Sequence, residues 1–292
     1  MYVYSIGIAR MLILLALALA YAIFDVFNKR NVPNKFVYFS VVIGIIATLA
    51  YYPDVYIMGV SALIAAIIGS LGYIIYRKGI LGAGDVFEFI LISLFIPLQP
   101  MPLLVNMPQF YLPFILSVFV VTGYVSFISI AFYYLLFVRN PEMERRMEGG
   151  RKSAIISSAF LTMYVLLIYV MGRINGFSSS AVLLIALVAI PSSIVLAYEK
   201  LINARMVAMI IPGKLEDGDM IAVNMMNREE SNYFTKHYKG FGRLATHALV
   251  KDMKHEKKKL PVYRNAPPLA LFMFAGVILA LLFGNVLLFF LL

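Results

Sequence analysis

The stretch IGIARMLILLALALAYAIFDVF, residues 6–27, is an apolar run of helical length that carries one acid, Asp25, near its end. About 20 apolar residues in a helix cross the roughly 30 Å hydrocarbon core of a bilayer. Across the 292 residues, 62% are hydrophobic and only 14% are charged, which is too few charges for the surface of a water-soluble globule. The sequence therefore predicts an all-α polytopic membrane protein, with the lipid bilayer as one of its partners.

Eight stretches have the length and composition of membrane helices, and we expect six to eight of them to be transmembrane. They are residues 6–27, 36–52, 55–76, 86–105, 110–138, 153–171, 178–198 and 267–292. The fourth is expected to end early, because Pro97, Pro100 and Pro102 interrupt a helix. The first is expected to remain as a membrane helix, because it lacks the features of a cleavable signal peptide.

The basic residues indicate the orientation. All of them except Arg10 and Arg173 follow the first, third, fifth or seventh apolar stretch. Loops rich in lysine and arginine stay on the cytoplasmic side of a membrane. We therefore expect a multi-pass protein of the cell membrane, with its N-terminus outside and its odd-numbered loops in the cytoplasm.

Residues 199–266 are polar and predict a small α+β cytoplasmic domain. A turn at 217–219 is expected to lead into a strand at 220–223, and residues 243–259 suit a helix. A domain of this size is expected to have little core of its own and to pack on the membrane domain. We expect the lysine-rich run 254–259 to be solvated near anionic lipid, and we expect no nucleic-acid partner.

The predicted organisation has three parts. Residues 1–198 form a transmembrane catalytic domain, with a core at about 10–135 and an extra helix pair at about 153–198; residues 199–266 follow, and 267–292 form a C-terminal transmembrane helix. The chain has no cysteine, so it forms neither disulfides nor a cysteine-based zinc site. No metal or cofactor is expected, because the three histidines, all within 199–266, are not grouped with acids at metal-ligand spacing.

Two acids stand out against the apolar background. Asp25 lies at the cytoplasmic end of the first predicted helix, and Asp85 lies at the cytoplasmic start of the fourth. Acids at a membrane boundary are costly to desolvate and mark candidate functional sites. Two carboxyls that share a proton can activate water and polarise a peptide carbonyl, which is the chemistry of aspartic proteases. Both acids are expected at the same depth.

Simpler roles exist for these acids. Asp85 closes Gly82-Ala83-Gly84-Asp85, in which the glycines suit a sharp turn and the close approach of another segment, but an aspartate there also suits a helix cap. Asp25 can pair with Lys29 one turn later. Glu88 shares the helical face of Asp85, and it suits either tuning of the pair, contact with a basic substrate residue, or an ordinary interfacial ion pair.

Two segments of the chain resemble the type IV prepilin peptidases. One is Gly82-Ala83-Gly84-Asp85. The other runs from Asp25 to Asn34, and in it Pro33-Asn34 follows the acid by eight and nine residues. These peptidases are GxGD-type membrane aspartic endopeptidases, and the resemblance covers about residues 10–135. It implies that Asp25 and Asp85 are the catalytic pair and that no cofactor is needed. The chain resembles the archaeal preflagellin and prepilin peptidases more than the bacterial members, although it is longer than the usual archaeal form and has Phe87 where many relatives have lysine.

The resemblance also implies the substrates. They are precursors of archaellins and type IV pilins, in which a short basic leader precedes an apolar helix and is removed as a class III signal peptide at the cytoplasmic face. Two acidic clusters are candidates for contact with the leader, although each also suits ordinary solvated surface. They are Glu142, Glu144 and Glu148, and Glu216, Asp217 and Asp219.

Two other functions remain open. Presenilin and signal peptide peptidase also use GxGD and cut within the bilayer, and Pro267-Pro268-Leu269 faintly resembles their third motif. A proton-coupled transporter would use Asp25, Asp85 and Glu88 as proton carriers through the broken fourth segment. The transporter reading expects acids near the membrane midplane and a repeated half-structure, and the sequence indicates neither.

Overall fold

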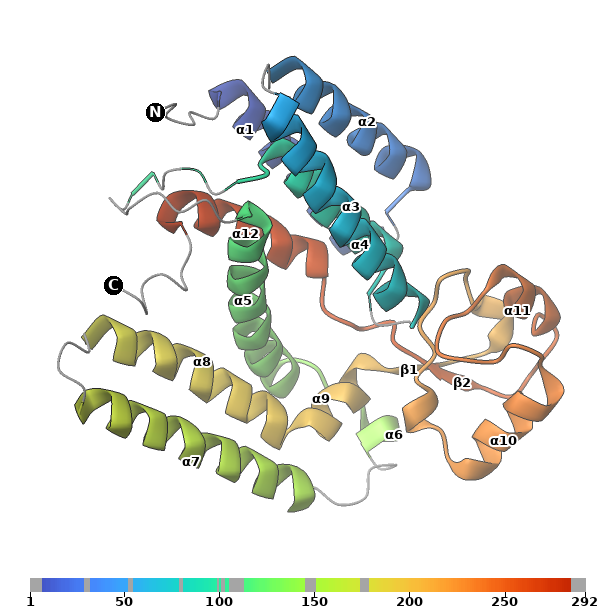
Figure 1. The fold of residues 1–292 in the computed structure, drawn as a ribbon. Helices are drawn as coiled ribbons and strands as arrows, with labels where there is room; N and C mark the ends of the chain where they lie inside the picture. Colours follow the sequence, from blue (N-terminus) through green and yellow to red (C-terminus); the bar gives the residue numbers. More distant parts are fainter. Residues whose placement is uncertain are drawn as a thin grey trace. The chain divides into compact units, whose positions relative to one another are not determined.

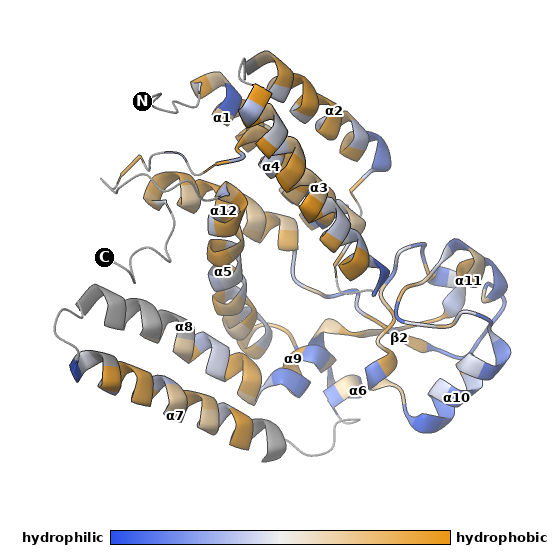
Figure 2. Ribbon diagram, viewed as in Figure 1, coloured by the Kyte–Doolittle hydropathy of each residue, from blue (hydrophilic) through white to orange (hydrophobic). Residues whose placement is uncertain are grey.

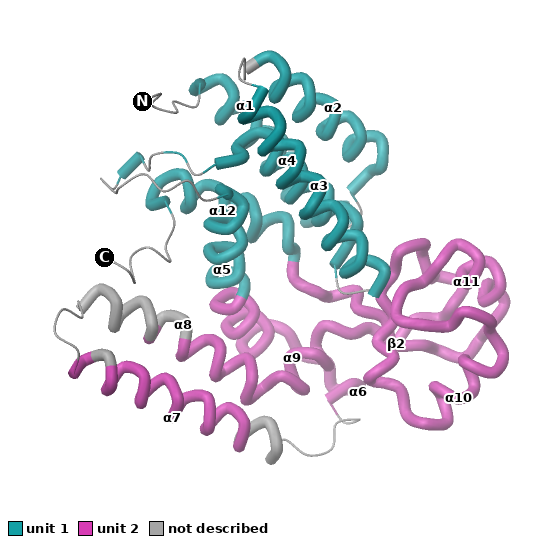
Figure 3. Tube along the Cα trace, viewed as in Figure 1, with its two compact units in different colours: residues 1–126, 268–292 teal, residues 127–267 magenta. Residues whose placement is uncertain are grey.

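The computed structural model describes residues 7–28, 32–51, 55–78, 81–98, 100, 103–104, 113–144, 151–173 and 179–284. The described residues are mostly helical, as the sequence predicts, and they include one small two-stranded sheet (Figure 1). The chain divides into two compact units (Figure 3). One unit comprises residues 1–126 and 268–292, and the other comprises residues 127–267.

The first unit is a helical bundle built around a short central helix. Its helices are α1 (Ile8–Phe27), α2 (Asn34–Tyr51), α3 (Val55–Arg77), α4 (Ala83–Phe95), the first part of α5 (Phe114–Leu136), and α12 (Leu269–Phe283). Helix α4 packs against α1, α2, α3 and α12, and residues 91–97 at and after its end are all buried. The core of this unit therefore surrounds α4.

Helices form at all eight predicted apolar stretches, and most of them are strongly apolar in Figure 2. Among the described residues, three helices are both long and apolar enough to cross a membrane, namely α1, α3 and α5. Shorter apolar helical segments lie at Asn34–Ala50, Ile155–Val170 and Leu269–Phe283. Many large apolar side chains on these helices are exposed, as a lipid environment allows. The crossing of six to eight helices stays a prediction.

Helix α4 ends inside the bundle at Phe95, two residues before Pro97, so the predicted early end is confirmed. The last carbonyls of a helix have no partner within it. Here the carbonyl oxygen of Leu94 accepts hydrogen bonds from Arg10 Nη2 at 2.8 Å and Thr48 Oγ1 at 2.8 Å, and from Ser61 Oγ at 3.3 Å. Side chains from three neighbouring helices thus satisfy the Leu94 carbonyl at the C-terminal end of α4.

The substitution Arg10→Met is expected to lower the stability of the bundle, because it removes the charged donor to the Leu94 carbonyl. Hydrogen bonds to charged groups contribute about 1.5–3 kcal/mol. Thermal unfolding of the detergent-solubilised chain measures the change, with Arg173→Met on α7 as the control, since Arg173 is exposed. Equal midpoints for the two variants would mean that Thr48 and Ser61 suffice at this helix end.

The second unit combines helices with a small mixed domain. Its elements after the end of α5 are α6 (Pro141–Glu144), α7 (Arg151–Arg173), α8 (Ser179–Ala197), α9 (Glu199–Met206), β1 (Ala208–Ile210), α10 (Arg228–His237), α11 (His247–Asp252) and β2 (Leu260–Val262), with 3-10 turns at Pro212–Lys214 and Val223–Met225. Helices α7 and α8 pack together, and Ser157 Oγ donates to the Ser193 carbonyl at 2.8 Å. Strands β1 and β2 are antiparallel, with Met209 opposite Pro261.

The part of this unit after α9 has a larger core than its length suggests. Eight buried apolar residues form it: Leu215, Ile221, Phe234, Ala245, Leu249, Met253, Leu260 and Val262. Helix α10 begins with a capping box, in which Asn227 Oδ1 accepts from the Glu230 amide and Glu230 Oε2 accepts from the Asn227 amide. The expectation of little core is therefore wrong.

Two local predictions in this region are also wrong. No strand spans 220–223, because only Met220 and Ile221 form isolated bridges before a 3-10 turn. The helix expected at 243–259 is limited to α11. Residues 243–245 pair instead with the turn at 217–221, where the Gly218 amide donates to Ala245 and the Ile221 amide to Arg243. Gly218 has φ of 89°, which favours glycine.

One carboxylate within the lysine-rich run after α11, that of Glu256, connects the run to α10 and to the tyrosine that follows it. Glu256 Oε2 accepts hydrogen bonds from Tyr233 and Tyr238 hydroxyls, each at 2.8 Å, and Oε1 accepts from the Lys258 amide at 2.8 Å. The Lys258 amide and the two hydroxyls lower the pKa of Glu256 to about 2. Lys254, Lys257 and the other lysines of the run are exposed, as expected for a solvated surface.

Candidate functional site

Asp25 lies on the buried face of α1 near its end and is 7% exposed. Its Oδ2 accepts a hydrogen bond at 3.0 Å from the amide of Ala270, the second residue of α12. The first amides of a helix lack partners within it, and the helix dipole favours a negative group there. Asp25 therefore caps the last helix of the bundle. The alternative partner, Lys29, lies outside the described residues.

Asp85 is the third residue of α4 and is half-buried. Its Oδ2 accepts a hydrogen bond at 3.0 Å from the amide of Gly82, which is the residue at the N-cap. Asp85 therefore does help to cap α4, as one of the simpler roles predicted. It does so from the third position of the helix, while Gly82 occupies the N-cap position. Both aspartates accept an amide at a helix start, which is a favourable place for a carboxylate.

The glycine motif lies against the segment that follows Asp25. A β-carbon added at Gly84 would lie 3.1 Å from Val32 Cγ2, closer than most such contacts. Val32 leads into Pro33-Asn34, and the Pro33 carbonyl accepts the amides of Phe36 and Val37 as α2 begins. The two segments that carry the family resemblance therefore contact each other. Glycine at position 84 allows this approach, while Ala83 is exposed.

Glu88 lies one turn after Asp85 and is 0% exposed. Neither of its carboxylate oxygens has a hydrogen-bond partner among the described residues. Asp85 and Asp25 are the charged groups that act on Glu88, and all three acids belong to the first unit. Within the described residues, no group of three or more histidine, aspartate or glutamate side chains is arranged to hold a metal ion.

Sequence reasoning missed two further parts of this site. Tyr21 is fully buried one turn before Asp25, and its hydroxyl forms a 2.8 Å hydrogen bond with Ser40 Oγ. Its four-residue spacing from Asp25 places both on one helix face, which was a usable signal. The Ala270 amide is the second part, and the only signal for it was the Pro267-Pro268 pair that precedes the last helix.

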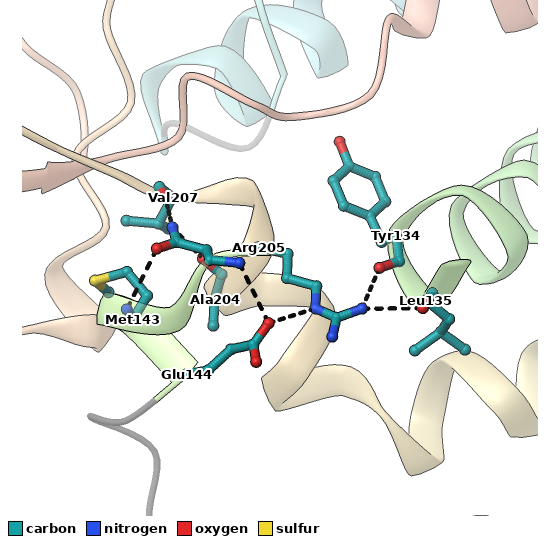
Figure 4. Close-up of polar contacts among 8 residues, drawn as sticks. Tyr134, Leu135, Met143, Glu144, Ala204, Arg205 and Val207 are labelled. Carbon is teal, nitrogen blue, oxygen red and sulfur yellow. Dashed lines mark hydrogen bonds and ion pairs between the residues drawn. The ribbon is translucent and has the colours of Figure 1, made fainter. Parts of the chain in front are cut away.

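Glu144, one of the acidic residues predicted to contact a leader, is paired with an arginine of the same chain. Glu144 Oε1 accepts from Arg205 Nε at 2.7 Å, and Arg205 Nη1 donates to the carbonyls of Tyr134 at 2.5 Å and Leu135 at 3.1 Å (Figure 4). The hydrogen bond from Arg205 lowers the pKa of Glu144. Arg205 thereby joins α9 to the end of α5, a role that the sequence did not indicate.

The remaining acids of the two clusters differ in their surroundings. Asp219 Oδ2 lies 3.0 Å from Arg264 Nη2, and Glu216 Oε1 lies 3.6 Å from the same nitrogen. Asp217 and Glu142 are exposed, and Glu148 lies outside the described residues. Of the acidic residues predicted to contact a leader, Glu142, Glu216 and Asp217 are therefore exposed in the described structure.

The fold and the site together define a helical, strongly apolar protein with Asp25, Asp85 and the buried Glu88 in one compact unit. No protein-family model, characterised protein or solved structure matches the chain. The resemblance to the prepilin peptidases therefore rests on the motif residues, Asp25 with Pro33-Asn34 and Gly82 to Asp85.

Proposed function

We propose that this chain is a membrane aspartic endopeptidase that removes class III signal peptides at the cytoplasmic face of an archaeal cell membrane. The observation that carries the proposal is that Asp25 and Asp85 each accept a backbone amide at a helix start within one compact unit, although 60 residues of sequence separate them. Both aspartates also act on the buried Glu88. Further support comes from the contact of Gly84 with Val32, which joins the two resemblance segments.

The proposed mechanism uses the two aspartates as one acid-base pair. The ionised carboxyl takes a proton from a water molecule as the water oxygen attacks the peptide carbonyl, and the protonated carboxyl donates a hydrogen bond to the carbonyl oxygen. When the tetrahedral intermediate collapses, the carboxyl that took the proton from water passes it to the leaving amine as the carbon–nitrogen bond breaks, and the two carboxyls again share one proton. No covalent enzyme intermediate and no cofactor are required.

The proposed substrates are archaellin or pilin precursors, in which a basic leader meets an apolar helix. Such a chain lies partly in the bilayer, so its cleavage needs catalytic groups at the boundary of the membrane. Asp25 near the end of α1 and Asp85 in the first turn of α4 suit that position, given the predicted cytoplasmic loops that follow α1 and precede α4.

One observation favours a second candidate, an intramembrane protease of the presenilin or signal-peptide-peptidase type. Pro267 and Pro268 precede α12, and Leu269 begins it. The next residue is Ala270, whose amide donates a hydrogen bond to Asp25. A proline-containing segment beside a catalytic aspartate would suit the third motif of those proteases. In that case the cut would fall within the apolar helix of the substrate.

The position of the cut distinguishes the two candidates. The full chain is produced in bacterial membranes together with a tagged archaellin precursor, and the new N-terminus is determined by mass spectrometry. We expect a cut at the junction between the basic leader and the apolar helix. A cut inside the apolar helix would support the second candidate, and an intact precursor beside correctly inserted chain would contradict both.

A further inference from the structure

Glu88 is a fully buried acidic side chain of the first unit. It is 0% exposed, and both of its oxygens lack a hydrogen-bond partner among the described residues. A buried carboxylate is costly unless it is paired or hydrogen-bonded. The negative charges of Asp85 and Asp25 act on the same group and add to this cost. Without a partner such a group is held neutral, and it becomes charged when a cation pairs with it.

The chemistry of the site indicates which kind of cation could pair with Glu88. Within the described residues no set of acids is arranged to hold a metal ion, so the three acids do not form a metal site there. A peptide substrate offers the lysine ammonium and the arginine guanidinium instead. Either group forms short, charge-assisted hydrogen bonds with a carboxylate, and such pairs are the usual way to satisfy a buried acid.

The geometry suits a long basic side chain. Glu88 lies three residues after Asp85, a rise of about 4.5 Å along the helix. Asp85 is half-buried while Glu88 is closed off, so a substrate side chain that reaches Glu88 has to displace the residues that cover it. The flexible four-carbon stem of lysine can pass through apolar surroundings and carry its charge one turn deeper.

We propose that Glu88 is a specificity-determining residue that pairs with a lysine or arginine side chain close to the scissile bond of the substrate. This inference rests on the proposed function, because it needs a peptide bound at the two aspartates. The pair would satisfy Glu88 when substrate is bound and would favour basic over apolar side chains at one substrate position.

The test compares cleavage of two sets of substrates. In a tagged archaellin precursor, each basic residue near the cut is replaced in turn by methionine, which is similar in length but uncharged. The full-length wild type and the Glu88→Gln variant are assayed in membranes. We expect the wild type to cleave the basic form at least about tenfold faster than the methionine form at one position. In Glu88→Gln that ratio should fall to near one, whatever the overall rate of the variant, because the ratio compares two substrates of the same enzyme.

The outcomes separate this inference from the proposed function. If wild type cleaves the precursor but Glu88→Gln keeps the full preference, or loses activity equally on all substrates, Glu88 does not read the substrate charge. Glu88→Asp keeps the carboxyl group and should retain part of the preference for the basic substrate. It replaces Glu88→Gln as the test variant if Glu88→Gln does not accumulate in the membrane. Asp252→Asn, an exposed carboxylate on α11, is the matched control. If the wild type cleaves no precursor, the proposed function itself fails.

Discussion

Replacing either Asp25 or Asp85 by asparagine is expected to abolish precursor cleavage, with a loss of at least about 10³-fold in rate. Asparagine has nearly the shape of aspartate but can neither take a proton from water nor hold one for the carbonyl oxygen. Its side-chain oxygen can still accept the Ala270 amide at position 25 or the Gly82 amide at position 85. The variants should therefore remain folded while chemistry stops.

The measurement is the fraction of tagged precursor that is converted, at equal amounts of enzyme in the membrane. Asp252→Asn makes the same chemical change at an exposed position of the small domain and should leave cleavage intact. Thermal unfolding in detergent should give similar midpoints for all variants and so exclude misfolding. Complete processing by Asp25→Asn or Asp85→Asn would refute the catalytic pair, even if the chain were a protease of another kind.

Much of the helical fold could be predicted, because apolar length and proline positions are local signals. The helices at 8–27 and 55–77 follow from composition, and the end of α4 at Phe95 follows from Pro97. The sheet could not be predicted. Its strands are only three residues long, and Met209 pairs with Pro261 across more than fifty residues. Such pairing depends on tertiary packing more than on local propensity.

The site was predictable only in part, for the same reason. Asp85 carries a four-residue motif, and Asp25 is an acid in an apolar run, so both were visible in the sequence. The partner of Asp25 is a backbone amide 245 residues away, which has no residue-type signal. Likewise, no spacing connects Glu144 with Arg205, whose contact arises from the meeting of α6 and α9.

The contact between α3 and α4 gives the second large expected effect. A β-carbon added at Gly72 on α3 would lie 2.4 Å from Val86 Cγ1, a distance that real contacts do not reach. Val86 follows Asp85 directly, so any shift of α4 that relieves the clash also moves the carboxylate. A displacement of about 1 Å at a catalytic group can cost roughly 10²-fold in rate. The substitution Gly72→Ala is therefore expected to lower cleavage by about that factor.

A second substitution can restore the lost space. Val86→Ala removes the methyl groups that an alanine at position 72 would meet, so the double variant should regain most of the activity of the wild type. Gly59→Ala on the same helix is the control, because its added β-carbon meets nothing within 4 Å and alanine is the better helix former. Initial cleavage rates of the four variants, at equal enzyme levels, give the measurement. A double variant no faster than Gly72→Ala alone would show that the close approach of α3 does not set the position of Asp85.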